Sequence, residues 1–332
     1  MAASAPGSST RVKAHGRPSG ADGPAGTRRR RVLVTGWPSF LHGEATAGDV
    51  LAMDAVRRAL DSAGVEHDLA WSPVFRPDGL HLDRADPRRY THLVFTCGPL
   101  HGPQVEELHR RFARCVRVAV GVSVVDPHAP AVTGFDAVLP RDAPGRAPRR
   151  DLAALPETPP VPVVGVVLAP GQAEYGTRRR HDRVERELTG WLAARACARL
   201  PLDTRLDPRD WRLFATAAEL ESALRRLDLV VTTRLHGLVL ALKNGVPALA
   251  VDPVAGGAKV TAQARAWPWP AVVTVPAGAP GQGTGRDGPL LDVRELDRWW
   301  DWCLRPGGTG RPPAPPPDAA LIDEMMDVLR AR

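Results

Sequence analysis

The segment from Asp228 to Val251, DLVVTTRLHGLVLALKNGVPALAV, constrains the fold more than any other part of the chain. An apolar run at residues 229–231 is typical of a strand that is buried on both faces. The pattern then predicts a helix over residues 235–243, which Thr233 can cap and which the turn sequence NGVP ends. A second buried strand follows at 247–251. The sequence therefore predicts one strand, helix, strand unit of a parallel sheet.

Two side chains suited to anion chemistry fall where this first strand passes into the helix. Ligands of parallel sheets bind at the carboxyl ends of strands, and Arg234 and His236 follow such an end directly. The free N–H groups of the first helical turn favour an anion, and an arginine beside them favours it further. Gly237 would let another group approach the backbone closely. The structural alternative stays open: Arg234 could pair with an acid of the same domain, and His236 could be a structural histidine.

These residues belong to a longer pattern, namely Arg234, Leu235, His236, Gly237, Ala241, Gly245, Pro247, Asp252 and Lys259. In order and approximate spacing it resembles the polysaccharide pyruvyl transferase family. The resemblance implies a fold like that of the GT-B glycosyltransferases, with phosphoenolpyruvate as donor and a sugar hydroxyl of a glycan, free or lipid-linked, as acceptor. It further implies that Arg234 and His236 take part in donor binding and catalysis, and that Leu235, Gly237 and Lys259 belong to the donor site.

A mechanism follows as a hypothesis. Arg234 would hold the carboxylate or phosphate of the donor, and His236 would transfer protons, because a histidine exchanges them near neutral pH. Lys259 would supply a further positive charge, and the run Arg178 to Arg180 is the alternative source of it. We expect no cofactor and no metal site.

The formal charge of +7, with a pI near 9.9, could suggest nucleic-acid binding. Residues 1–31, however, hold seven basic residues and one acid, so they account for six of the seven net charges. The remaining chain shows no basic stripe interleaved with aromatic residues, which argues against specific nucleic-acid recognition. Residues 1–30 are interpreted as a disordered, solvated basic tail. Non-specific contact of this tail with nucleic acid or anionic lipid is the alternative.

The four cysteines show no CxxC spacing and are typical of buried thiols in a reducing compartment. No secretory signal and no apolar run of membrane-spanning length occur in the sequence, so we expect a cytoplasmic protein.

The alternation of strand and helix patterns predicts an α/β protein with two Rossmann-like domains and parallel sheets. We place an N-terminal acceptor domain at 31–150 and a C-terminal donor domain at 160–304, joined through a linker rich in Pro, Arg and Ala. A Pro-rich linker and a C-terminal helix at 305–332 would pack back on the first domain. Other expected strands are 32–35, 92–96, 117–123, 136–139, 163–168 and 271–275, and other expected helices are 47–60, 105–116, 180–200 and 217–227.

The first half departs from the family pattern. Where the family has a GNxGD loop, this chain reads ATAGD, so Gly48 and Asp49 remain and Thr46 replaces the asparagine. A second loop reads CGPLHG, with Pro99 and His101 as interruptions. Asp49 and His101 are candidates for a first-domain site, although Asp49 can equally be the N-terminal cap of the helix that follows.

Two other functions remain open. A nucleotide-sugar glycosyltransferase of the same architecture is one, but residues 252–259, DPVAGGAK, lack the glutamate that such enzymes usually place there. A degenerate, non-catalytic relative is the other. A cluster of tryptophans near residue 300 could suggest a carbohydrate platform, but helical spacing places Trp299 and Trp300 in a core and leaves only Trp302 free.

Overall fold

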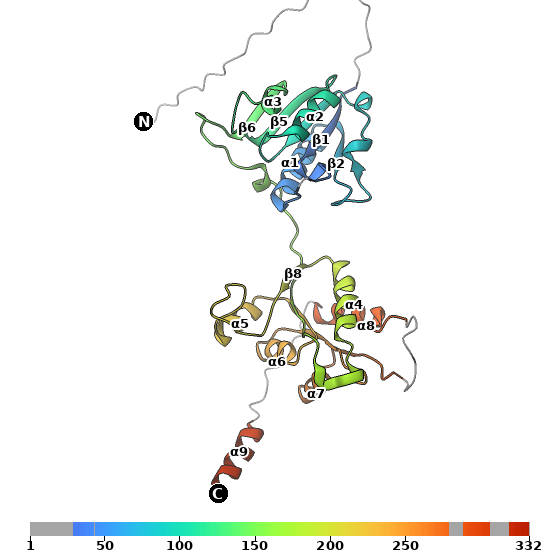
Figure 1. Ribbon diagram of the computed structural model, residues 1–332, viewed down its shortest axis with the longest axis vertical. Helices are drawn as coiled ribbons and strands as arrows, with labels where there is room; N and C mark the ends of the chain where they lie inside the picture. The colour runs from blue at the N-terminus through green and yellow to red at the C-terminus, as the bar shows by residue number, and fades with distance from the viewer. Residues whose placement is uncertain (1–28, 43, 279–287, 306–318, 332) are drawn as a thin grey trace, which may run out of the picture. The chain divides into compact units, whose positions relative to one another are not determined.

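The computed structural model describes residues 29–42, 44–278, 288–305 and 319–331. The chain divides into two compact units, Met1–Thr158 and Pro159–Arg332, which Figure 1 draws in blue to green and in green to red. Residues 1–28 of the predicted basic tail and residues 306–317 of the Pro-rich linker lie outside the described residues. No helix in the described ranges is long and apolar enough to cross a membrane.

The first unit is a six-stranded parallel sheet in the order β3-β2-β1-β4-β5-β6. Apolar residues of β1 alternate between its two faces: Leu33 packs with Phe95 and Phe112, whereas Val32 and Val34 pack with the α1 side. Both faces are therefore covered, as a Rossmann-like domain requires. The strands are β1 Arg31–Gly36, β2 Glu66–Trp71, β3 Leu80–His81, β4 His92–Thr96, β5 Val116–Ser123 and β6 Ala137–Asp142, and the α-helices are α1 Ala47–Ser62, α2 Pro103–Arg111 and α3 Pro130–Thr133.

The second unit is a five-stranded parallel sheet in the order β11-β10-β9-β7-β8. Every residue of β9 and β10 is buried, so both faces of the central strands are covered. The two sheets confirm the predicted α/β fold with two parallel, Rossmann-like sheets. The strands are β7 Val163–Val167, β8 Ala198–Pro201, β9 Leu229–Thr232, β10 Ala248–Asp252 and β11 Val272–Thr274, and the helices are α4 His181–Ala193, α5 Ala217–Leu224, α6 Leu235–Lys243, α7 Lys259–Ala266, α8 Val293–Cys303 and α9 Ala320–Arg330.

Some expected helices are shorter in the structure, and three strands were not expected. The helix expected over 180–200 ends at Ala193, and β8 begins at Ala198. β8 has no apolar run, because it lies at the sheet edge, where its residues are largely exposed and Pro201 is tolerated. The first unit also contains β2 and β3, which the expected strands omit, and the helix expected over 105–116 ends at Arg111.

The tryptophan prediction is wrong for one residue. Trp302 is half-buried against the core of the second unit, and its ring lies 5.2 Å from that of Trp269 and 5.8 Å from that of Trp299, centroid to centroid. Trp302 meets both rings edge to face, so it packs with the core and is not free for a carbohydrate. Every residue of α9 is exposed, including Leu321 and Leu329. Packing of this helix on the first domain, like the GT-B arrangement of the two domains, stays a prediction.

Candidate functional site in the second unit

Two threonines shape the turn from β9 into α6. Thr232 Oγ1 donates a hydrogen bond to the Val167 carbonyl (2.8 Å) and accepts one from the Arg234 N–H (2.9 Å). Thr233 Oγ1 accepts from the Ala169 N–H (2.8 Å), so it joins the loop after β7 and does not cap the helix as predicted. Arg234 is the N-cap residue and no side chain caps α6. The N–H groups of its first turn therefore remain available to a ligand.

A pocket of about 400 Å³ lies at this turn. The strand order places it at the topological switch point of the second sheet, because β8 lies on one side of β7 while β9 and the later strands lie on the other. Crevices of this kind bind ligands in open α/β sheets. The pocket is lined by Ala169, Pro170, Gly171 and Gln172 after β7, by Thr233, Arg234, Leu235 and His236 after β9, and by Lys259 at the start of α7.

The predicted charged residues meet in this pocket but differ in their partners. Arg234 Nη1 donates to Asp203 Oδ1 at 3.2 Å, which is the pairing with an acid of the same domain that the sequence left open. His236 lies in the first turn of α6 and is exposed. Lys259 Nζ lies 3.9 Å from Glu174 Oε1 and 5.8 Å from the centre of the Tyr175 ring. The pocket thus holds two cationic side chains, one histidine and an uncapped helix N-terminus.

Gly237 has a packing role and does not line the pocket. It is buried, and a Cβ atom at this position would lie 2.3 Å from Thr232 Oγ1 and 3.1 Å from Val167 Cγ1. The group that approaches the Gly237 backbone is therefore the end of the sheet. This contact allows α6 to begin directly over β7 and β9, which brings Arg234 and His236 to the pocket.

Asp252 organises the loop between β10 and Lys259. The carboxylate is fully buried and accepts hydrogen bonds from the backbone N–H groups of Val254 (3.2 Å), Ala258 (2.7 Å) and Thr261 (2.9 Å), and from Thr261 Oγ1 (2.9 Å). It holds the first turn of α7, and so the backbone of Lys259, in place.

The alternative cations lie outside the pocket lining. Arg178 donates from Nε to the Ala255 carbonyl (3.0 Å) and from Nη2 to the Gly257 carbonyl (2.7 Å). Arg179 pairs with Asp182 at 2.9 Å, and Arg180 donates to carbonyl oxygens of its own loop. These arginines stabilise loops. Of the two predicted sources of a further positive charge, Lys259 lines the pocket and the run Arg178 to Arg180 does not.

Candidate functional site in the first unit

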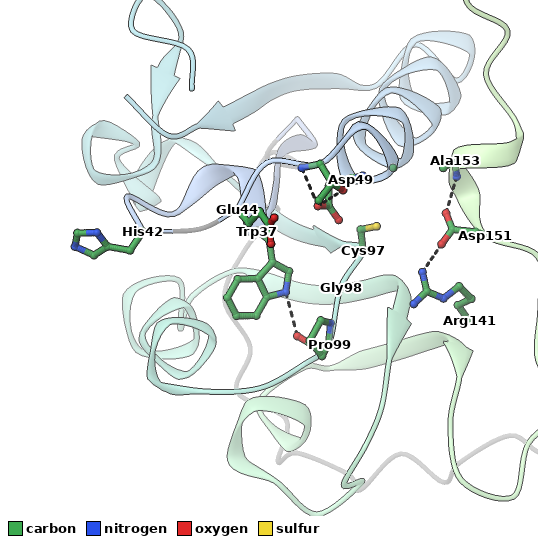
Figure 2. Close-up of a pocket in the computed structure, with 12 residues that line it drawn as sticks. Trp37, His42, Glu44, Asp49, Cys97, Gly98, Pro99, Arg141, Asp151 and Ala153 are labelled. Atoms are coloured by element: carbon green, nitrogen blue, oxygen red, sulfur yellow. Dashed lines mark hydrogen bonds and ion pairs between the residues drawn. The ribbon is translucent and has the colours of Figure 1, made fainter. Parts of the chain in front are cut away.

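A second pocket of about 580 Å³ lies in the first unit, again at a topological switch point, where β1 and β4 are neighbours and the strand order reverses. Figure 2 shows Asp49 beside Cys97 and the indole of Trp37 beside Pro99. The lining residues are Trp37, His42, Glu44, Thr46, Gly48, Asp49, Cys97, Gly98, Pro99, Arg141, Asp151 and Ala153.

Of the two residues predicted for a first-domain site, the structure places Asp49 in this pocket. His101 is exposed and does not line it. Its neighbour Leu100 takes the buried position, and the next side chain is directed to solvent. The pocket therefore contains one of the two predicted residues, and a functional role of His101 stays a prediction.

Asp49 is the third residue of α1, and Thr46 is the N-cap, so the cap predicted at Asp49 lies three residues earlier. Thr46 Oγ1 accepts from the Asp49 N–H (3.2 Å), and Asp49 Oδ2 accepts from the Thr46 N–H (3.3 Å), which forms a capping box. The same carboxylate lies beside Cys97. Burial and this neighbouring charge raise the pKa of the Cys97 thiol to about 12, so it is a protonated group that can donate to Asp49 and not a nucleophile.

The pocket wall after β4 contains two consecutive residues with left-handed backbone conformation. Cys97 has φ of 70°, unusual for a residue with a side chain, and Gly98 follows with φ of 67°. A Cβ atom on Gly98 would lie 2.1 Å from the Trp37 ring, whose Nε1 donates to the Pro99 carbonyl at 3.1 Å. The turn therefore holds the indole against the loop. Backbone strain of this kind is concentrated at functional sites.

Carboxylates dominate the charge of this pocket. Arg141 already donates to Asp151, to Asp142 Oδ2 (2.8 Å) and to Ser123 Oγ (2.6 Å). Glu44, Asp49 and Asp151 thus outnumber a guanidinium that is itself paired. Such a lining accepts hydrogen bonds from hydroxyl groups and disfavours an anion.

Several residues that line the two pockets or pair with a lining residue were not identified from the sequence. Asp203 follows β8, an element interpreted as helix, so its place at a strand end was hidden. Trp37 follows β1 as Arg234 follows β9, and position after a buried strand could have indicated it. Arg141 lies near the end of the predicted acceptor domain, and Asp151 lies in the stretch interpreted as linker. Within the described residues no cluster of three or more His, Cys, Asp or Glu side chains could hold a metal ion.

Comparison with known proteins gives one family match. The family model described as polysaccharide pyruvyl transferase matches residues 166–253. A sequence search of curated proteins gave no match.

Solved structures that align with the chain do so at low similarity. The spinosyn rhamnosyltransferase SpnG complexed with thymidine diphosphate has 14% identity, 89% of this chain and 100% of its own covered, and a TM-score of 0.29. E. coli heptosyltransferase WaaC with ADP has 14% identity and a TM-score of 0.26, and the alignment covers 82% of this chain and 99% of that one. UDP-GlcNAc 2-epimerase from Methanocaldococcus jannaschii has 8% identity and a TM-score of 0.31, and the alignment covers 91% of this chain and 100% of that one. Residues 166–253, which hold Arg234 and His236, thus match the polysaccharide pyruvyl transferase family, as the sequence resemblance predicted.

Proposed function

We propose that this protein transfers the pyruvyl group of phosphoenolpyruvate to two hydroxyl groups of a glycan sugar and forms a cyclic ketal. The main support is the pocket at the switch point of the second sheet. It combines Arg234, Lys259, the uncapped N-terminus of α6 and the exposed His236. All of its lining residues except Lys259 lie in the segment that matches the pyruvyl transferase family. This combination suits a small donor with several negative charges and a reaction that needs proton transfer.

In the proposed reaction His236 gives a proton to the methylene carbon of phosphoenolpyruvate, and the adjacent carbon becomes cationic. A sugar hydroxyl attacks that carbon and returns its proton to His236. A second hydroxyl of the same sugar then displaces phosphate, which leaves with the remaining proton, and the ring closes. Arg234, Lys259 and the α6 N–H groups stabilise the negative charge that stays on the carboxylate and accumulates on the leaving phosphate.

The first-unit pocket is proposed as the acceptor site. Its excess of carboxylates accepts hydrogen bonds from sugar hydroxyls, and the held indole of Trp37 offers an apolar wall of the kind that sugar rings contact. An anionic donor would be disfavoured there by Glu44, Asp49 and Asp151. The two pockets therefore differ in charge as a donor site and an acceptor site should.

The test follows phosphate release from phosphoenolpyruvate with candidate glycans that carry neighbouring hydroxyls. Arg234→Ala should lower kcat/KM by about 100-fold or more, because an anion-stabilising donor is lost. His236→Ala should lower kcat by a factor of roughly 100 to 10,000, because the proton transfer loses its catalyst. Arg265→Ala and His128→Ala, exposed residues outside both pockets, are the matched controls and should keep full activity.

Unchanged turnover in both pocket variants would refute the assignment. Saturable binding of a nucleotide sugar, without binding of phosphoenolpyruvate, would point instead to a glycosyltransferase.

A further inference from the structure

The acid that pairs with Arg234 comes from a distant part of the unit. Asp203 follows β8 and Arg234 follows β9, and β7 lies between these two strands in the sheet. The Asp203 carboxylate and the Arg234 guanidinium meet at 3.2 Å, and their side chains are 21% and 23% exposed. Because solvent screens such a half-buried pair only in part, the contact restricts Arg234 more than a surface ion pair would.

Asp203 is itself held in one orientation. Its Oδ1 atom accepts from the Arg205 N–H (2.8 Å), and its Oδ2 atom accepts from Arg205 Nε (2.7 Å). Burial by itself would raise the pKa of Asp203, but the hydrogen bonds from Arg205 and the charges of Arg205 and Arg234 lower it below its ordinary value. The carboxylate is therefore charged and fixed before any ligand arrives.

The pairing leaves part of the Arg234 guanidinium free. Among the described residues, Nη1 has a protein partner, whereas Nε and Nη2 have none. A guanidinium binds a carboxylate or phosphate best through two parallel N–H groups, and the edge formed by Nε and Nη2 provides such a pair. Holding Nη1 at Asp203 leaves this edge for an anion in the pocket.

We infer that Asp203 is a positioning residue, which orients Arg234 so that its Nε and Nη2 groups bind the anionic donor. The inference rests on the proposed function, since it concerns the donor pocket. It assigns a role to a residue that the pattern from Arg234 to Lys259 does not contain. The inference predicts a change in anion affinity on removal of Asp203 that is opposite in sign to the change expected from charge alone. Removing an acid beside an anion site should tighten anion binding by Coulomb attraction, whereas removing a positioning acid should weaken it.

Glu174 supplies the matched control. Its carboxylate lies 3.9 Å from Lys259 Nζ and is 60% exposed, and no hydrogen bond joins the two residues within the described part of the chain. Glu174 therefore acts on the pocket through charge and does not fix Lys259. Glu174→Gln should leave anion binding unchanged or make it tighter.

The experiment measures binding of inorganic phosphate to the full chain by titration calorimetry at low salt. Asp203→Ala should weaken phosphate binding by about tenfold, because a mobile Arg234 loses entropy on binding. Asp203→Asn, which keeps an oxygen that can accept from Nη1, should recover part of this loss and serves as the isosteric variant if Asp203→Ala folds poorly. In turnover, Asp203→Asn should raise KM for phosphoenolpyruvate more than it lowers kcat.

Phosphate binding that is equal or tighter in both Asp203 variants would overturn the positioning role. The Arg234→Ala variant separates this failure from that of the donor site. If Arg234→Ala weakens phosphate binding while the Asp203 variants do not, the donor site stands and only the inference falls. If Arg234→Ala binds phosphate as the unmodified protein does, the donor site is wrong and the inference falls with it.

Discussion

Gly237 shows how one missing side chain determines the position of the donor pocket. The β9 to α6 turn is tight enough that the Thr232 hydroxyl, which bonds to the Val167 carbonyl, fills the space where a Cβ atom would stand. A larger residue would push the first turn of α6 away from the sheet. Arg234 and His236 directly precede this glycine at the start of α6, so they would move with it.

Gly237→Ala should therefore lower the free energy of unfolding by about 1–3 kcal/mol, the usual cost of overpacking a buried site. Chemical denaturation measures this. Gly190→Ala is the control, because a Cβ atom at Gly190 in α4 meets no other atom within 4 Å. This helix-interior change should stabilise by about 0.5–1 kcal/mol. A Gly237→Ala variant as stable as the unmodified protein would contradict the packing account.

His181 gives the second unit a pH-dependent stability. It is 3% exposed at the start of α4, and neither ring nitrogen has a hydrogen-bond partner among the described residues. Burial, and then the charges of Arg179 and Lys259, lower its pKa, while Asp182 and Asp252 oppose them. The unfolded chain therefore binds this proton more tightly than the folded one does.

Neutral His181 thus makes its full contribution to the free energy of unfolding at a pH above the ordinary histidine pKa of 6.5. The contribution is lost as the pH falls from there toward the lower pKa of His181 in the folded state. His181→Leu should flatten this part of the profile of unfolding free energy between pH 7 and 5. Burial also lowers the pKa of His109, so the contribution of His109 to the pH dependence of stability should remain. Identical pH profiles for the two proteins would rule out a contribution from His181.

At the scale of elements, the loop from β10 to α7 depends on a single buried carboxylate. Asp252 accepts four hydrogen bonds from residues 254–261, and this loop ends at the pocket with Lys259. The sequence pattern contained Asp252 but gave no reason for it. The structure supplies the reason, because two consecutive left-handed glycines, Gly256 and Gly257, give the loop a tight path that needs an anchor.

Asp252→Ala should reduce the free energy of unfolding by about 3 kcal/mol, because several charge-assisted hydrogen bonds are lost at once and their donors stay buried. It should also weaken phosphate binding through Lys259. Asp301→Ala, an exposed acid on α8, should change stability by less than about 0.5 kcal/mol. Thermal melting and calorimetry test both parts, and an Asp252→Ala protein with unchanged melting would contradict the anchoring role.

The elements differ in how well the sequence predicted them. The bounds of α6 agree with the prediction, because an apolar strand precedes it and Asn244 and Gly245 end it, the latter with φ of 72°. β8 was not predicted, because this exposed edge strand has no apolar run. Local signals predict elements whose burial is complete, whereas elements at an edge depend on neighbours that the sequence does not name.

For the whole molecule, the alternation of strands and helices predicted two parallel sheets but not the order of strands in either. The first sheet reverses its order between β1 and β4, and the second between β7 and β9. Each reversal opens a crevice, and the two pockets lie there. Because strand order results from long-range packing, Asp203 could not be assigned to a site from local patterns.

The sequence by itself determined that Arg234 and His236 stand together at a strand-to-helix turn, since residues so close in a helical turn cannot be far apart. Only the tertiary structure decided that Lys259 joins them and that Asp203 pairs with Arg234. It also decided that Asp49 lines the first-unit pocket while His101 does not, and that Gly237 serves packing. These outcomes depend on contacts between residues far apart in the chain. Sheet order creates such contacts, and periodicity along the sequence does not specify that order.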